Sequence, residues 1–206
     1  MIDAIDPART ALLLIGYQRD YFDTDGALYS VIEESTRASG TLENTESLLS
    51  GLTDSPSTIV STPIVFSETY NELENPIGIL KIIKDVEAFK VGTPGAETID
   101  MISAYGDRIL EIPGKKGFDA FSNTDLLQTF KDRGINRVVF AGAVTSICVN
   151  ATALRAFDEG FDVIMLSDCI SGRTAVEHEM FCNEIFPLFT EVLGHKEFLM
   201  RSGVSA

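Results

Sequence analysis

Short, almost continuously apolar runs alternate with longer stretches of helical periodicity along this chain, and this alternation constrains its fold more than any other feature. Strands that are apolar along their whole length are typical of a parallel sheet covered on both faces. The apolar runs predict strands over 11–15, 64–66, 108–112, 138–141, 163–166 and, weakly, 197–200. The periodic stretches predict helices over 41–52, 78–85, 94–104, 124–133, 146–159 and 174–189. The sequence therefore predicts an α/β, Rossmann-like fold: three α-β-α layers around a roughly six-stranded parallel sheet.

Length and composition fit one domain. The chain has 206 residues, of which 45% are hydrophobic and 23% charged, so a single domain over 1–206 can bury a substantial core. A formal charge of −15 disfavours nucleic acid and anionic membrane surfaces as partners. No apolar run approaches a membrane span, and the first residues lack the pattern of a signal peptide. We expect a cytoplasmic protein whose partner is a small-molecule substrate.

Three cysteines occur, Cys148, Cys169 and Cys182, with no short paired spacing. This pattern argues against a disulfide framework or a zinc site, so we expect free thiols. Cys169 and Cys182 are interpreted as small buried residues. Asp168 is expected to hold its loop through hydrogen bonds rather than to catalyse.

Cys148 stands out because it lies where a predicted strand turns into a predicted helix. The run 138–141 ends at Gly142, and helical spacing begins a few residues later. In the first turn of a helix, free backbone N–H groups and the helix dipole favour a thiolate and can hold an oxyanion. The sequence therefore predicts a cysteine nucleophile here.

In a parallel sheet, ligands bind beyond the carboxyl ends of the strands. Gly16, Glu68, the loop after residue 112 and the turn before Cys148 should all meet at that edge. The neighbouring side chains Tyr17, Tyr21, Glu68, Tyr70 and Phe118 are candidate walls of a pocket there, although aromatic residues beside strand ends commonly serve only packing.

Three segments together resemble the isochorismatase-like cysteine hydrolase superfamily, which includes nicotinamidases and other amidohydrolases. Residues 11–22, ALLLIGYQRDYF, are similar to the family's first strand and Q-x-D-F turn. Residues 115–126, KKGFDAFSNTDL, are similar to its K-x-x-x-S-A-F…T-D-L pattern. Residues 142–149, GAVTSICV, are similar to G-x-x-T-x-x-C-V. The three occur in the family's order between residues 11 and 149, so the resemblance extends over most of the chain.

The resemblance implies specific roles. Cys148 matches the family's nucleophile and Lys115 its catalytic lysine, with Lys116 fitting the spacing less well. The family's cis peptide would join Ala143 to Val144, and the backbone N–H groups of Val144 and Cys148 would hold the oxyanion. The family also implies a homo-dimer or homo-tetramer.

One position departs from the family. Gly16 stands where the family has the aspartate that transfers protons, although Gln18, Asp20 and Phe22 keep the surrounding pattern. Another acid could substitute, namely Glu68, Glu72, Asp20 or Asp119, but each is more simply a solvated or capping carboxylate. Alternatively, Gly16 is an introduced or accidental change in an active enzyme, or the chain is a natural non-catalytic relative.

Metal and cofactor motifs are absent from the sequence. The region 67–71 has no histidine where nicotinamidases of the family carry metal ligands, and the only histidines, His178 and His195, are expected at the surface. No glycine-rich nucleotide motif occurs. We therefore expect neither a metal nor a cofactor.

These observations predict a cysteine-dependent hydrolase that cleaves the C–N bond of a small non-peptide amide or ureide through a thioester. The missing acid–base group predicts weak turnover. The alternative is a non-catalytic small-molecule binding protein that uses the same pocket.

Overall fold

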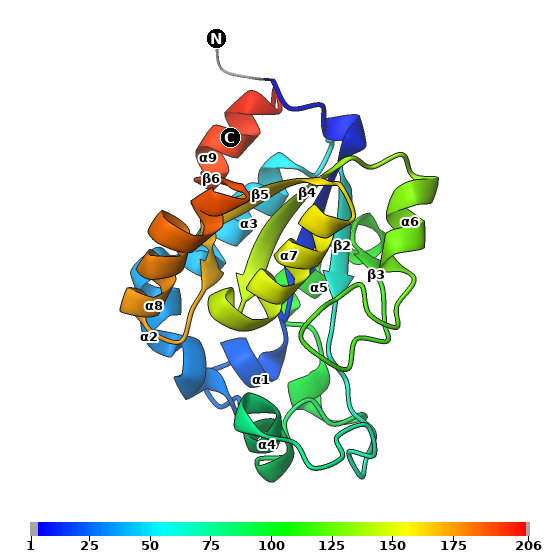
Figure 1. Ribbon diagram of the computed structural model, residues 1–206, viewed down its shortest axis with the longest axis vertical. Coiled ribbons are helices and arrows are strands. Elements are labelled where there is room, and N and C mark those ends of the chain that lie inside the picture. The colour runs from blue at the N-terminus through cyan, green and yellow to red at the C-terminus, as the bar shows by residue number, and fades with distance from the viewer. Residues whose placement is uncertain (1–3, 205–206) are drawn as a thin grey trace.

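The computed structural model describes residues 4–204, and its centre is one six-stranded parallel sheet (Figure 1). The strands lie in the order β3-β2-β1-β4-β5-β6. Their bounds are β1 Thr10–Ile15, β2 Thr58–Thr62, β3 Leu110–Glu111, β4 Arg137–Ala143, β5 Asp162–Ser171 and β6 Glu191–Leu193. The strand order reverses between β1 and β4, so the connections that follow these two strands run in opposite directions. They leave a crevice beyond the carboxyl ends of β1 and β4. The predicted α/β class and parallel sheet are confirmed.

Helices cover both faces of the sheet (Figure 1). The α-helices are α1 Arg19–Phe22, α2 Tyr29–Ser39, α3 Thr41–Gly51, α4 Gly78–Asp85, α5 Asp100–Ser103, α6 Leu126–Asp132, α7 Asn150–Asp158, α8 Ala175–Met180 and α9 His195–Arg201. Short 3₁₀ turns are η1 Pro7–Arg9, η2 Pro94–Ala96, η3 Gly106–Arg108 and η6 Phe186–Leu188, and wider π turns are η4 Thr145–Val149 and η5 Phe181–Ile185.

Strand β1 shows why the central runs are apolar throughout. Leu12 and Leu14 point into a core shared with α3 and α9, whereas Leu13 and Ile15 point into a second core shared with α6 and α7. All four side chains are fully buried. Alternate residues therefore serve opposite faces, and no position of the strand reaches water.

Two strand predictions were wrong. Residues 64–66 follow β2 instead of forming it, and they make only isolated bridges, Ile64 with Lys115 and Phe66 with Lys90. The last strand is β6, whereas residues 197–200 lie entirely within α9. Strand β2 contains buried Ser61 and Thr62, whose polarity hid it from an apolar-run criterion.

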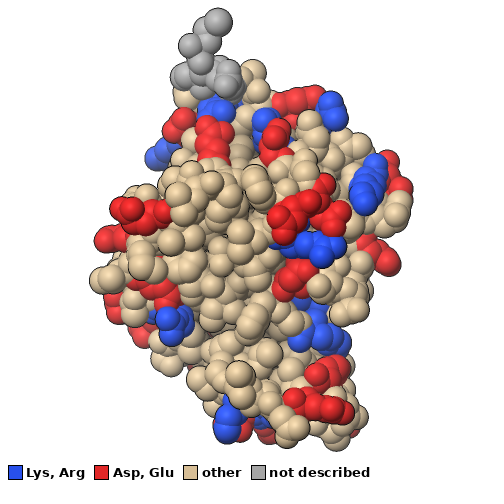
Figure 2. Space-filling model, in the orientation of Figure 1, with Lys and Arg blue, Asp and Glu red and all other residues tan. Residues whose placement is uncertain are grey.

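The surface bears out the acidic composition. Figure 2 shows acidic side chains scattered over the visible face, with fewer basic ones among them. Within residues 4–204, no helix has the length and apolar character needed to cross a membrane.

Candidate active site

A small pocket lies beyond the carboxyl ends of β1 and β4, where the strand order reverses. Its free volume is about 10 Å³, the space of roughly one water molecule. The lining residues are Ile15, Gly16, Tyr21, Ile64, Ile79, Leu80, Ile83, Phe89, Lys115, Phe118, Ala143, Ile147 and Cys148. The pocket thus brings Gly16, Lys115 and Cys148 together from three separate parts of the chain.

Cys148 lies in the π turn η4, directly before α7, and is 8% exposed. The peptide bond between Ala143 and Val144 is cis. The Val144 carbonyl accepts hydrogen bonds from the N–H groups of Ile147, at 2.9 Å, and Val149, at 3.2 Å. These bonds fix the backbone on both sides of Cys148 and hold its thiol at the pocket.

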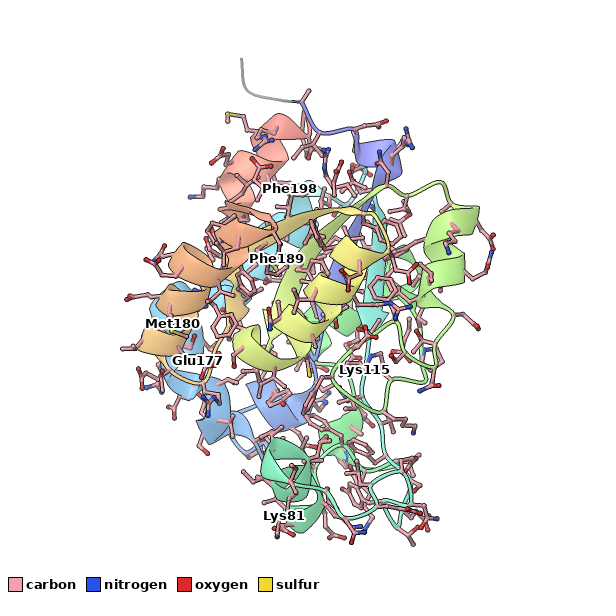
Figure 3. The ribbon with its side chains drawn as sticks, in the orientation of Figure 1. Lys81, Lys115, Glu177, Met180, Phe189 and Phe198 are labelled. Carbon is pink, nitrogen blue, oxygen red and sulfur yellow. The ribbon has the colours of Figure 1, made fainter. Side chains whose placement is uncertain are left out.

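Lys115 is held beside this thiol by an extension of the sheet. Its backbone bridges Ile64 in parallel, and its side chain is buried (Figure 3). The ammonium donates to the Gly117 carbonyl at 2.6 Å and lies 3.5 Å from Cys148 Sγ. No carboxylate of residues 4–204 lies within 4.0 Å of it. The buried Lys115 ammonium is thus placed to donate to the Cys148 sulfur.

Gly16 directly follows β1 and has a backbone conformation that favours glycine, with φ at +71°. A Cβ atom placed there would lie 3.0 Å from the Ala143 carbonyl oxygen and 3.6 Å from the ring of Tyr21. Both neighbours line the pocket. A side chain at position 16 would therefore project into the pocket close to the cis peptide.

Two of the carboxylates considered as substitutes bind other groups. Asp20 is buried and accepts hydrogen bonds from the N–H groups of Phe89, at 2.6 Å, and Ala27, at 3.3 Å. Glu72 forms an ion pair with Lys116 at 3.0 Å. Each joins segments of the loops around the pocket, and neither lines it.

The other two also lie outside the pocket. Asp119 accepts from the Phe121 N–H at 2.9 Å and from the Ser122 hydroxyl at 2.6 Å, so it caps its own turn. Glu68 is exposed on the loop after residue 66, and its predicted place at the pocket wall is wrong. Within the described part of the chain, the space beside Gly16 therefore has no carboxylate.

The aromatic candidates divide into two groups. Tyr21 and Phe118 line the pocket, and burial followed by the nearby Cys148 charge raises the pKa of Tyr21. Tyr17 does not line it, because its hydroxyl bonds to the Thr45 hydroxyl at 2.6 Å within the core. Tyr70 is also buried elsewhere and donates to a backbone carbonyl.

The sequence interpretation did not place α4 at the pocket, although this helix forms one of its walls. Ile79, Leu80 and Ile83 face Cys148, whereas Ile82 is exposed and Lys81 points to solvent (Figure 3). The i, i+3 and i, i+4 spacing of the inward residues was visible in the sequence and indicates an amphipathic helix. Nothing in that spacing said which cavity the helix would cover.

The expectation that both histidines lie at the surface was wrong. His195 is 2% exposed, and its Nδ1 lies 2.7 Å from Asp168 Oδ2. Asp168 Oδ1 also accepts from the His195 N–H at 2.9 Å, which agrees with the predicted structural role of Asp168. His178 is half-buried, and its ring contacts the Thr145 hydroxyl at 3.3 Å.

The other two thiols are free and remote from the pocket. Burial, followed by the Asp168 charge, raises the pKa of Cys169 well above its ordinary value. Burial raises the pKa of Cys182 to about 12. The ligating atoms of Cys169, Asp168 and His195 lie within 4.8 Å of one another, but both carboxylate oxygens already bind His195.

Comparisons with known proteins agree on one family. A family model described as the isochorismatase domain matches residues 10–197. Uncharacterized isochorismatase family proteins from Escherichia coli and Bacillus subtilis are 34% and 36% identical over 85 residues, which span 41% of this chain and 45% of each relative. A maleamate amidohydrolase from Pseudomonas putida is 24% identical over 94% of this chain and 86% of its own length.

Solved structures share the fold. A cysteine hydrolase from Pseudomonas syringae superposes with a TM-score of 0.86 at 18% identity, covering 97% of this chain and 95% of that one. An N-carbamoylsarcosine amidase from Thermoplasma acidophilum superposes with a TM-score of 0.71 at 18% identity, covering 91% of this chain and 96% of that one.

Proposed function

Because this chain belongs to the isochorismatase family, we propose that it hydrolyses the C–N bond of a small non-peptide amide or ureide through a thioester on Cys148. The observation that carries the proposal is the buried Lys115 ammonium, 3.5 Å from the Cys148 sulfur, at the crevice between β1 and β4. Amidohydrolases occur among the relatives of the chain, which supports this reaction class. We further propose a cytoplasmic location and, on the family resemblance, a homo-dimer or homo-tetramer.

In the proposed reaction, Cys148 attacks the carbonyl carbon as a thiolate that Lys115 stabilises. The oxyanion that forms is held by the backbone N–H groups of Val144 and Cys148. The C–N bond then breaks and the leaving nitrogen takes up a proton from water. Attack of water on the thioester breaks the C–S bond, releases the acid and regenerates the Cys148 thiolate.

Proton transfer is the weak part of this cycle. The departing nitrogen needs an acid, and the attacking water needs a base. No carboxylate of residues 4–204 lines the pocket, and the raised pKa of Tyr21 keeps its phenol protonated and unable to act as the base. We therefore propose that an activated ester, whose leaving group needs no proton, acylates Cys148 readily, whereas cleavage of an amide C–N bond and hydrolysis of the thioester are slow.

The absence of a pocket carboxylate favours a second function, the binding of a small molecule without catalysis. Both functions use the same pocket. They differ in whether Cys148 forms a covalent bond to an acyl group.

Acylation by an activated ester, 4-nitrophenyl acetate, tests the proposal with intact-mass detection of the acyl-enzyme. One acetyl group should appear on the unchanged chain and none on Cys148→Ala. Removing the ammonium in Lys115→Met should slow acylation at least about tenfold, equivalent to roughly 1.4 kcal/mol. The matched control, Lys116→Met, alters a lysine that binds Glu72 instead and should leave the rate unchanged.

Equal acylation of the chain and of Cys148→Ala would refute the nucleophile. Saturable binding of small amides without any acylation of Cys148 would establish the binding function instead.

A further inference from the structure

We infer that the Cys148 pocket selects substrates with a neutral, aliphatic acyl group and excludes those whose acyl group carries a carboxylate. This inference rests on the proposed function and names the class of substrate for the same site. The juxtaposition that carries it is the inner face of α4, with Leu80 and Ile83, against the buried Lys115–Cys148 pair.

The walls around the sulfur are almost entirely hydrocarbon. Three aliphatic side chains of α4, Ile79, Leu80 and Ile83, form one side. Ile64 and Ile147 come from the segments that position Lys115 and Cys148. Any group attached to the carbonyl that Cys148 attacks must lie against these side chains, so apolar area on that group is removed from water.

The pocket offers no cation that is free to bind a carboxylate. Lys115 is its one charged residue, and the ammonium is already bound to the Gly117 carbonyl and lies against Cys148. No arginine of residues 4–204 lines the pocket, and Tyr21 remains neutral. A carboxylate buried here would lose its hydration without gaining a partner, which is strongly unfavourable.

The charge of the whole molecule acts in the same direction. A net charge of −15 lowers the local concentration of anionic substrates near the protein. A pocket selective for such anions would need a local positive group to overcome this field.

The size of the pocket makes its walls decide fit. The free volume of about 10 Å³ holds roughly one water molecule, so an acyl group enters only if lining side chains, those of α4 among them, move. An aliphatic acyl group restores the apolar contacts that this movement breaks. A carboxylate restores none of them.

Three acyl donors test the inference: the acetyl, isovaleryl and succinyl thioesters of N-acetylcysteamine. Transfer of the acyl group to Cys148 breaks the donor's C–S bond and forms the new thioester, and intact mass reports it. Isovaleryl and succinyl groups have similar lengths and differ in charge. We expect the isovaleryl group to transfer at least about tenfold faster than the succinyl group, a difference of roughly 1.4 kcal/mol.

A positive charge added on either face of α4 provides the matched pair of variants. Leu80→Arg places a guanidinium on the half-buried inner face and should raise the succinyl rate relative to isovaleryl at least about tenfold. Ile82→Arg adds the same charge on the exposed face of the same helix and should leave the ratio unchanged. The acetyl rate reports whether each variant keeps a working pocket.

The outcomes separate the two proposals. If no donor acylates Cys148, the proposed function fails. If acetyl transfers but succinyl matches or exceeds isovaleryl on the unchanged chain, the proposed function stands and the specificity inference is overturned. An equal change of the ratio in Ile82→Arg and Leu80→Arg also overturns it, because long-range charge and not the pocket wall would then set the preference.

Discussion

Two buried basic side chains lie at the carboxyl edge of the sheet, and only one of them has a carboxylate. His195, just after β6, is held by both oxygens of Asp168, at 2.7 and 2.9 Å. Lys115, beside β2, has a backbone carbonyl and the Cys148 sulfur as neighbours. Cys148 therefore lies beside Lys115, the buried basic side chain that has no carboxylate partner.

The difference shows that the basic side chain beside β5 and the one near the end of β1 have different roles. The pair at Asp168 is complete and joins β5 to the start of α9, which is a structural task. The pair at Lys115 is incomplete because Gly16 follows β1, where a carboxylate would have reached the pocket. An ammonium bound to a carbonyl and a sulfur, with no carboxylate beside it, cannot supply the base that thioester hydrolysis requires.

Adding a carboxylate to the pocket at position 16 should have the largest effect on activity. In Gly16→Asp, the new carboxylate enters beside Lys115 and Cys148 and supplies the missing acid–base group. We expect amide hydrolysis to rise by about 10²–10⁴-fold. The φ of +71° and the close Ala143 carbonyl should lower the free energy of unfolding by about 1–2 kcal/mol. Steady-state hydrolysis of a panel of small amides and denaturant unfolding measure the two effects.

Gly16→Asn is the matched control, since it has the same shape and the same backbone conformation but no acid. Both variants should lose similar stability, and only aspartate should gain activity. Equal gains in amide hydrolysis from both variants, or no gain from aspartate in a folded protein, would contradict the interpretation that the pocket lacks an acid–base group at position 16.

Breaking the pair of Asp168 and His195 should lower the stability of the fold and leave the reactivity of Cys148 unchanged. Asp168→Ala leaves the buried His195 ring and N–H without their acceptors, so the free energy of unfolding should fall by about 2–3 kcal/mol. The acylation rate of Cys148 should not change in the folded variant. Asp162→Ala is the control, because its pair with Arg137 is exposed and should contribute less than about 1 kcal/mol. Equal losses in both variants would show that the buried pair is no more stabilising than the surface one.

The parts of the fold that the sequence predicted are those whose burial is uniform. Strands β1 and β4 are buried along nearly their whole length, so apolar runs located them within one or two residues. Helix α2 was missed because its sequence YSVIEESTRAS is mostly polar and buries only Ile32 and Ser35. Short β6 depends on pairing with β5, a contact between chain segments that local patterns do not encode.

The candidate site shows the same limit. The family resemblance implied that Lys115 and Cys148 lie together, but it could not separate Tyr17 from Tyr21 as pocket walls. The turn that begins at Gly16 sends Tyr17 into the core beside Thr45 and Tyr21 into the pocket. Likewise, the buried position of His195 follows from its contact with Asp168, far away in sequence. Such choices depend on tertiary contacts.

Lys116 allows the comparison to be made between adjacent lysines, because it has the carboxylate partner that Lys115 lacks. Burial alone would raise the pKa of Glu72, but hydrogen bonds from Ser67 and the contact with Lys116 lower it to about 2, below the ordinary value of 4.5. A depressed carboxyl pKa stabilises the folded state above pH 4.5, and this stabilisation is lost as the pH falls through 4.5 toward 2. In Glu72→Gln we therefore expect the free energy of unfolding to fall by about 1 kcal/mol near neutral pH, after allowance for solvent screening of this exposed group. This loss of stability should become smaller as the pH is lowered. Denaturant unfolding between about pH 3 and 7 measures it. Glu74→Gln, at an exposed carboxylate on the same loop, should show no such trend. A loss in Glu72→Gln that is independent of pH would mean that the charge of Glu72 does not stabilise this loop, and that Lys116 is no better partnered than Lys115.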